Sequence, residues 1–219
     1  MERIRAERET LVKAGKIKRD KKDSVIVKSD DNSYYEKIDG KGVCIDEQIP
    51  FNVAETWGWY RLSELWNLLS GRDLTPSEYT DNELGIPYIT GAGNFTNNGL
   101  IINRWTSCPK VVAQNDDLLI TCKGTIGTMM INKQGKIHIA RQIMAVRNRE
   151  DLNVEFLRIV MASFIVQITS AAKGIIPGIS REDLLDMLIP LPPLAEQQRI
   201  VTAIETAFEQ LDIIIENLV

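Results

Sequence analysis

The chain has 219 residues, 44% of them hydrophobic, and its 26 lysines and arginines are outnumbered by 30 aspartates and glutamates, which gives a formal net charge of −4. This composition excludes an intrinsically disordered chain, and the net acidity argues against a protein that coats nucleic acid without regard to sequence. We expect one sizeable core with helical extensions.

Signals for membrane insertion, secretion and metal binding are absent from the sequence. No apolar run approaches the length of about 18 residues that crosses a membrane, and the N-terminus is charged throughout. Cys44, Cys108 and Cys122 form no Cys-x-x-Cys pair, and His138 is the only histidine. We therefore expect a cytoplasmic protein with reduced thiols, no metal and no cofactor.

Residues 1–15 are the first predicted element, the end of an amphipathic helix. Ile4 and Leu11 occupy heptad positions, and Gly15 suits the C-terminal cap. A helix this short is marginal alone in water, so we expect it to continue an absent helix or to pack on another one. Residues 16–52 follow as a linker, which is lysine-rich at first and then acidic and rich in loops.

Residues 53–190 are the predicted globular domain, which begins near an aromatic cluster at Trp57. A helix is expected over residues 63–70. Short apolar runs between glycine and asparagine turns predict a mixed or antiparallel sheet, with strands at residues 86–90, 100–103, 118–122, 125–131, 136–139 and 143–146. Apolar residues at helical spacing predict a core helix over residues 153–170. The expected fold class is therefore α+β.

Residues 191–219 are predicted to form a long helix. The helix begins at about Leu194, because Pro192 and Pro193 cannot lie inside a helix upstream of it. From there, apolar residues recur at spacings of three and four, the a/d pattern of a coiled coil, and only Gln197 interrupts it: Leu194, Val201, Ile204, Phe208, Leu211, Ile215 and Leu218. We expect this seam of about 37 Å to pair with another helix. A helix packed on the chain's own core is the alternative.

The charges are unevenly distributed along the chain. Within residues 104–149, only Asp116 and Asp117 oppose eight cations, namely Arg104, Lys110, Lys123, Lys133, Lys136, Arg141, Arg147 and Arg149. We interpret this basic stripe as a footprint for phosphates. A solvated face that happens to be basic is the alternative.

Motifs for catalysis are missing. Residues 90–96 begin like a dinucleotide-binding loop, but Thr96 stands where the third glycine belongs, so we expect a turn. Residues 123–128 lack the Gly-Lys-Ser/Thr ending of a phosphate loop and are interpreted as a tight turn with Lys123 and Thr125 exposed at its tip. A single histidine and no nucleophile elbow leave little for triad chemistry. The sequence predicts a protein that binds rather than reacts.

The segment Pro-Leu-Pro-Pro-Leu-Ala-Glu-Gln-Gln-Arg-Ile-Val at residues 190–201 closely resembles a family sequence. In the specificity (S) subunits of Type I restriction-modification systems, such a segment ends a target recognition domain and opens a conserved helix. Residues 4–18, Gly-Thr-Ile-Gly at 124–127 and Gly-Ile-Ile-Pro-Gly-Ile-Ser at 174–180 also look like family features. An S subunit of this family carries two recognition domains, and its two conserved helices lie antiparallel as a spacer.

The resemblance implies a noncatalytic subunit that reads one part of a bipartite target in double-stranded DNA. Its implied partners are methyltransferase (M) subunits and, in the full complex, restriction (R) subunits. The chain would be part of a longer S subunit, or a half-subunit that forms a homodimer through its helices. Two rivals are a coiled-coil adaptor whose globular domain binds a protein, and a stand-alone nuclease or methyltransferase, for which we find no motif.

Side chains on loops are the candidates for DNA contact, because bases are recognised by directed hydrogen bonds and phosphates by cations. The first set is Lys123, Thr125, Arg141, Gln142 and Lys173, and the second is Asn94, Asn97 and Arg104. Among them, Gln142 suits adenine and Arg141 suits guanine. The predicted helix-pairing interface consists of the a/d residues of the C-terminal helix together with Ile4 and Leu11.

Overall fold

The computed structural model describes residues 10, 13, 24–38, 41–149, 151–171 and 178–218, and for residues 166–171 only the backbone helix. Ile4 and Leu11 of the predicted N-terminal helix, and the candidate Lys173, lie outside these residues. The chain divides into two compact units. Unit 1 comprises residues 1–66 and 182–191, and unit 2 comprises residues 67–181 and 192–219. The predicted domain of residues 53–190 contributes to both.

Unit 1 contains a three-stranded antiparallel sheet where the sequence suggested mostly loop. Its strands are β1 (Ser24–Lys28), β2 (Tyr34–Ile38) and β3 (Lys41–Cys44), in that order, and the 3-10 turn η1 (Asp46–Gln48) follows. Alternate residues are buried, with Ile26 and Tyr34 at 8% and 7% exposure. This alternation is the pattern of a sheet with one covered face.

A second pair of strands in unit 1 joins distant parts of the sequence. β4 (Gly58–Arg61) pairs antiparallel with β15 (Leu188–Leu191), and the short helix α2 (Leu62–Leu65) follows β4. Arg61 connects this pair to the rest of the unit, because its guanidinium donates 2.7 Å hydrogen bonds to Glu36 and to the carbonyl of Asp186.

The helix predicted over residues 63–70 is wrong in its second half. α2 ends at Leu65, and β5 (Leu68–Ser70) is a strand that pairs antiparallel with β14 (Ile143–Val146) in unit 2. The backbone bonds that β5 gains from β14 override the local helical preference of the sequence.

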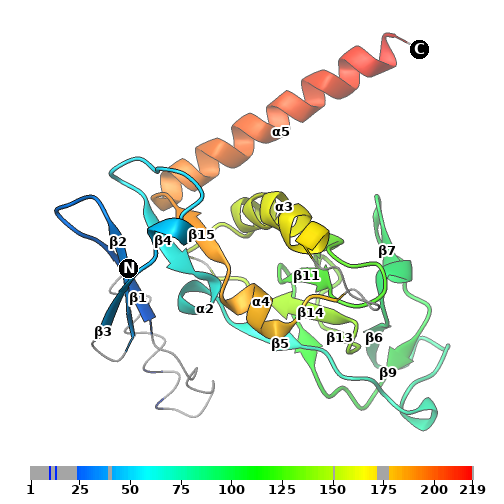
Figure 1. Cartoon of the computed structure of the whole chain (residues 1–219). Coiled ribbons are helices and arrows are strands. Elements are labelled where there is room, and N and C mark those ends of the chain that lie inside the picture. Colours follow the sequence, from blue (N-terminus) through cyan, green and yellow to red (C-terminus); the bar gives the residue numbers. More distant parts are fainter. Residues whose placement is uncertain are drawn as a thin grey trace. The chain divides into compact units, whose positions relative to one another are not determined.

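Unit 2 is built on two four-stranded sheets (Figure 1). The first has the order β12-β11-β14-β5 and is antiparallel, with β11 (Leu118–Thr121) and β12 (Met129–Ile131). The second has the order β10-β13-β6-β9, with β6 (Ile86–Ile89), β9 (Trp105–Thr106), β10 (Val112–Ala113) and β13 (Ile137–Ile139). Because β13 and β6 are parallel, the predicted mixed sheet is confirmed.

Short elements complete the strand region of unit 2. They are the 3-10 turns η2 (Pro76–Glu78) and η3 (Ala92–Asn94), and a hairpin of β7 (Phe95–Thr96) and β8 (Gly99–Leu100). The predicted strand at residues 100–103 is wrong, because beyond Leu100 these residues are not in a strand.

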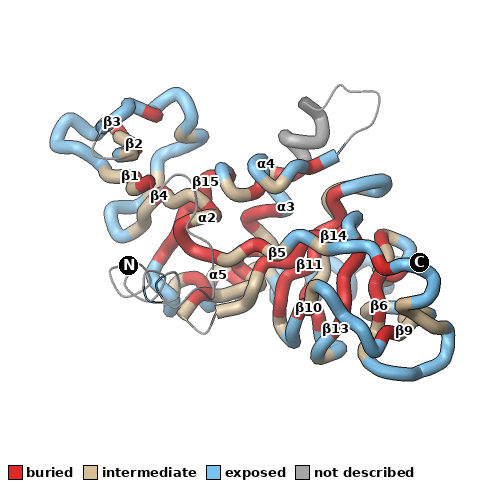
Figure 2. The backbone as a smooth tube through the Cα atoms, turned by 90° about the horizontal axis from the view of Figure 1, so that it is seen from below, coloured by how far each residue is buried: buried red, intermediate tan, exposed pale blue. Residues whose placement is uncertain are grey.

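The core of unit 2 is formed by side chains from the strands of both sheets. Its central cluster consists of Ile89, Ala113, Leu119, Ile137, Ile139, Ile143 and Ala145, each fully buried. Figure 2 shows the burial along β11, β13 and β14, whereas many of the connections are exposed. The predicted core helix is confirmed as α3 (Val154–Ala171), which contacts β12, and α4 (Arg181–Leu185) follows further along the chain.

The long C-terminal helix is confirmed as α5 (Leu194–Glu216), which begins directly after Pro193. Its first turns pack on α3, and Val201 is only 3% exposed. From residue 205 to residue 218, by contrast, every side chain is exposed. The first part of the seam therefore packs on α3 of the same chain, and the rest of the seam is exposed. Among the described helices, none has the length and apolar character needed to cross a membrane.

Gln197, which interrupts the apolar seam, fastens α5 to the start of α3. It is 1% exposed, its Oε1 accepts the N–H of Asn153 at 2.9 Å, and its Nε2 donates to the carbonyl of Pro192 at 2.9 Å. Asn153 in turn caps α3, because its Oδ1 accepts the N–H of Phe156. One buried amide thus connects the starts of the two helices through hydrogen bonds.

Candidate functional site

Four connections of unit 2 meet at the ends of its strands. They are residues 71–73 after β5, 90–91 after β6, 122–125 after β11 and 140–142 between β13 and β14. Backbone bonds join them: the N–H of Cys122 donates to the carbonyl of Gln142 at 2.8 Å, and that of Ala140 donates to the carbonyl of Ile89 at 2.9 Å. We call these four segments the loop edge.

The tight turn predicted at residues 123–128 is confirmed, and the strand predicted over residues 125–131 is correct only from Met129 onward. Lys123 and Thr125 are exposed, and Gly124 and Gly127 have positive φ angles of 75° and 82°, which glycine adopts without strain. A Cβ at Gly127 would lie 2.6 Å from Cγ2 of Ile165, so the turn sits closely on α3. Lys123 and Thr125 therefore lie in solvent, while the end of the turn at Gly127 is held against α3.

Arg141 and Gln142 are exposed beside this turn. The Nε of Arg141 donates to Oδ2 of Asp73 at 2.8 Å. Oε1 of Gln142 lies over Gly91, where an added Cβ would approach it to 2.4 Å. The structure thus brings the sequence candidates Lys123, Arg141 and Gln142 together on the loop edge, although 18 residues separate Lys123 from Arg141 in the sequence.

The second set of candidates fares differently. Asn94 is only 3% exposed, its Oδ1 accepts the N–H groups of Thr90 and Gly91, and its Nδ2 donates to the carbonyl of Ile101. Since this amide holds the predicted turn together from inside, we remove Asn94 from the candidate interface. Asn97 is exposed between β7 and β8.

Arg104, the last of the second set, is half-buried and stacks on an aromatic ring. Its guanidinium carbon lies 4.8 Å from the ring centroid of Tyr79. The cation is therefore held at a fixed place on unit 2.

The basic stripe of residues 104–149 needs correction. Five of its cations are paired with carboxylates: Lys110 with Glu78, Lys133 with Asp116, Arg141 with Asp73, Arg147 with Asp117, and Arg149 with Asp151. Counting charges within one stretch of sequence overlooked partners that folding supplies from outside it. In that stretch, Arg104, Lys123 and Lys136 have no ion-pair partner among the described residues. The surface suits directed hydrogen bonds better than diffuse attraction to phosphates.

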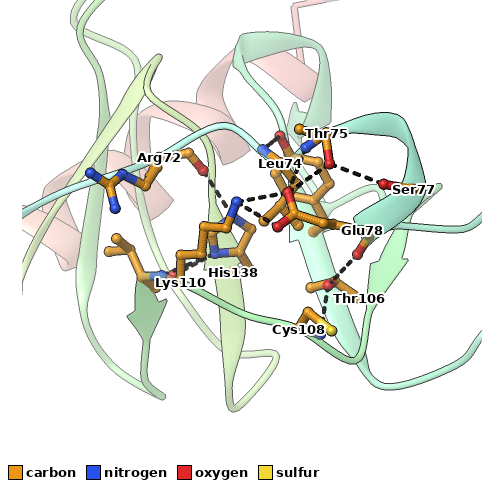
Figure 3. Close-up of polar contacts among 11 residues, drawn as sticks. Arg72, Leu74, Thr75, Ser77, Glu78, Thr106, Cys108, Lys110 and His138 are labelled. Carbon is orange, nitrogen blue, oxygen red and sulfur yellow. Dashed lines mark hydrogen bonds and ion pairs between the residues drawn. The ribbon is translucent and has the colours of Figure 1, made fainter.

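His138 is structural and anchors the connection after β5 (Figure 3). It is fully buried, its Nε2 lies 2.9 Å from the carbonyl oxygen of Arg72, and its Nδ1 contacts the backbone of Val111. Burial lowers the pKa of His138, although both backbone contacts act in the opposite direction. Nearby, the hydrogen bond from Lys110 lowers the pKa of Glu78 to about 2.

Sequence reasoning missed three members of the loop edge. Asp73 binds Arg141, Gly91 lies under Gln142, and the exposed Arg72 adds a cation. A Gly-Arg-Asp stretch after an apolar run signals a turn. No sequence signal, however, connects Asp73 to a residue 68 positions further along the chain.

Among the described residues, no group of three His, Cys, Asp or Glu side chains could hold a metal ion. Burial raises the pKa of the Cys122 thiol, which disfavours the reactive thiolate. What the loop edge provides is an exposed arrangement of lysine, arginine and glutamine donors, the side chains that read base edges and contact phosphates.

Known proteins with a similar sequence or fold are specificity (S) subunits of type I restriction-modification systems. A putative type I restriction enzyme MjaX specificity subunit from Methanocaldococcus jannaschii is 24% identical over 165 residues, which are 74% of this chain and 39% of the relative. The HsdS subunit from Thermoanaerobacter tengcongensis superposes with a TM-score of 0.67 at 27% identity, over 75% of this chain and 40% of that one. The S subunit from M. genitalium shares the fold, with a TM-score of 0.53 at 18% identity, over 77% and 43%.

The chain aligns with only part of each of these relatives. The chain spans about two fifths of the length of the relatives it matches. The family model for the type I restriction modification DNA specificity domain matches residues 54–218, which include the loop edge and α5. Because that match covers most of its length, the chain belongs to the family of type I restriction-modification DNA specificity domains.

Proposed function

We propose that this chain recognises one part of a bipartite sequence in double-stranded DNA and directs M subunits, and R subunits in the full complex, to that target. It contributes recognition and no chemical step of its own. Since its DNA and its methyltransferase partner lie inside the cell, we place it in the cytoplasm. None of the relatives described above is named as a protein-binding adaptor.

The gathering of Lys123, Arg141 and Gln142 on the loop edge carries this proposal. All three are exposed, and each comes from a connection fixed by backbone bonds to buried strands. Base reading needs donors and acceptors that are held in place before DNA arrives, because ordering them on binding would cost affinity. Thr125 and Asn97 are exposed in the same unit and belong to the proposed interface, as does the half-buried Arg104.

Binding of the chain together with its M partner to a library of random duplex DNA tests the proposal. We expect an enriched sequence, and an affinity that falls as salt rises. Lys123→Ala should weaken binding to all sequences and reduce the salt slope by about 0.9, because it removes one phosphate contact. Gln142→Ala should instead relax the preference at one base pair.

A matched control uses Lys136, which is exposed but lies directly before β13, away from the loop edge. Lys136→Ala should leave the enriched sequence unchanged. A library without any enriched sequence would contradict the proposed function, whatever the variants do.

We also propose that the bare part of α5 pairs with another helix. Phe208, Leu211 and Ile215 are 62%, 52% and 57% exposed, and the helix presents them along one side. A second copy of the chain, a further part of a longer S subunit and an M subunit are the candidate partners. Two copies would place two loop edges on one split DNA target.

Substitutions on two sides of α5 test helix pairing. Phe208→Glu should abolish the assembly measured by light scattering, either of the chain alone or with its M partner, because a buried charge would lie in the seam. Thr206→Glu places the same charge on an exposed position outside the seam and is the control. Equal assembly of both variants would argue against pairing through the seam.

A further inference from the structure

Asp73 makes two contacts with Arg141. Its Oδ1 accepts the backbone N–H of Arg141 at 3.1 Å, and its Oδ2 accepts a hydrogen bond from the side-chain Nε at 2.8 Å. The side chains of Arg141 and Asp73 are nevertheless 69% and 46% exposed. The pair therefore stands in solvent, where an ordinary surface ion pair contributes little to stability.

The backbone on both sides of this pair is firmly held. The N–H groups of Gly71 and Arg72 donate to the carbonyls of Ile143 and Ile139 at 3.0 and 2.9 Å. The carbonyl of Arg72 lies against Nε2 of His138, as Figure 3 shows. A Cβ at Gly71 would come within 2.0 Å of the carbonyl oxygen of Ala140, so the two segments run in direct contact.

The contact at Nε determines what the rest of the guanidinium can do. An arginine can present two donor pairs, one along its side through Nε and one at its end through the two Nη atoms. Asp73 occupies Nε, which leaves the end pair for a partner. The carboxylate also compensates the positive charge, so the attraction of Arg141 for phosphates is weakened while its directed donors remain.

We propose that Asp73 is a positioning residue that presents the Nη donors of Arg141 to a base edge with two acceptors, the pattern of guanine O6 and N7 in the major groove. Asp73 itself touches no base. It converts a cation that would bind any phosphate into a reader of one base pair. The inference rests on the proposed function and adds a residue that determines specificity.

The variant Asp73→Asn separates the positioning of the Arg141 side chain from the structural role of Asp73, which is to hold the backbone of Arg141. The side-chain oxygen of the substituted amide still accepts the backbone N–H of Arg141, whereas the amide nitrogen donates and so cannot accept from Nε. We expect discrimination at one base pair to fall by about tenfold. Binding to unrelated DNA should tighten, and its salt slope should steepen by about 0.9, because Arg141 gains an uncompensated charge.

The experiment measures both quantities on the chain in complex with its M partner, using a random duplex library followed by the enriched duplex and an unrelated one. Asp116→Asn is the matched control, because Asp116 forms an exposed ion pair with Lys133 before β11, at the end opposite the loop edge. Its αL backbone, with φ of 64°, accepts asparagine readily. This control removes the same charge and should leave the preference unchanged.

Three results would overturn the inference. An unchanged base preference in Asp73→Asn would show that Arg141 needs no positioning. An equal loss of affinity for both duplexes would assign Asp73 a purely structural role. If the wild-type complex shows no sequence preference, the proposed function fails and this inference fails with it, whereas the first two results overturn the inference and leave the proposed function standing.

Discussion

Gly91 leaves space that a neighbouring side chain occupies. Its backbone is extended, with φ of 172°, so alanine can adopt the same conformation. An added Cβ would nonetheless come within 2.4 Å of Oε1 of Gln142, which is the movable end of a flexible side chain. Position 91 therefore controls where Gln142 points, without a cost in backbone strain.

Gly91→Ala should change the base preference of the protein and leave its folding nearly intact. The altered preference should match that of Gln142→Ala, and the free energy of unfolding should change by less than about 1 kcal/mol. Library selection and urea denaturation measure the two quantities. Gly93→Ala is the control, because nothing lies within 4 Å of a Cβ there. A preference that Gly91→Ala leaves untouched would show that Gln142 reads DNA from another position.

We expect His138 to make the stability of the fold depend on pH. Burial lowers its pKa below the ordinary value of 6.5, so between the two values the unfolded chain binds a proton that the folded chain does not. Stability is therefore fully present above the unfolded pKa and is lost as pH falls through about 6.5, by at most about 1.4 kcal/mol per pH unit. Urea denaturation from pH 8 to pH 5 checks this. His138→Gln should lack this component of the pH profile, and an identical profile in both proteins would contradict the prediction.

At the scale of elements, Gln197 connects α5 to α3. Gln197 is 1% exposed, and replacing it by leucine would complete the apolar a/d pattern of the seam. The same change removes the hydrogen-bond partners of the N–H of Asn153 and of the carbonyl of Pro192. Gln197→Leu should therefore lower the free energy of unfolding by about 1–3 kcal/mol. Gln198→Ala, which removes only an exposed bond to Asn153, is the control. Greater stability of Gln197→Leu in urea denaturation would show that the seam prefers an apolar residue there.

The sequence predicted elements where local pattern and tertiary environment agree. The helix after Pro193 and the core strand of Ile143–Val146 were predictable, because prolines and continuous apolar runs act locally. The strand Leu68–Ser70 was not, since only its pairing with β14 makes it a strand. At the site, glycines marked the turn of Lys123, whereas the pairing of Asp73 with Arg141 and the burial of Asn94 depend on the whole fold.

At the scale of the whole molecule, the length of α5 should determine the gap between two DNA half-sites. Duplicating residues 206–212 after Asp212 keeps the heptad pattern and lengthens the helix by about 10 Å, since each residue adds about 1.5 Å. The added length lies beyond the part of α5 that packs on α3. Methylation mapping with the M partner should show a preferred gap longer by about three base pairs at about 3.4 Å per pair. An unchanged gap would show that the length of α5 does not determine the spacing of the half-sites.

The bare end of α5 also bears on how the protein survives in a cell. Between Phe208 and Leu218, six large apolar side chains are more than half exposed, namely Phe208, Leu211, Ile213, Ile214, Ile215 and Leu218. An uncovered patch of this kind is a target for quality-control proteases and a nucleus for aggregation. Copies that find no helix to cover it should be degraded, so the cellular amount of this protein should follow the supply of its partner rather than its own rate of synthesis.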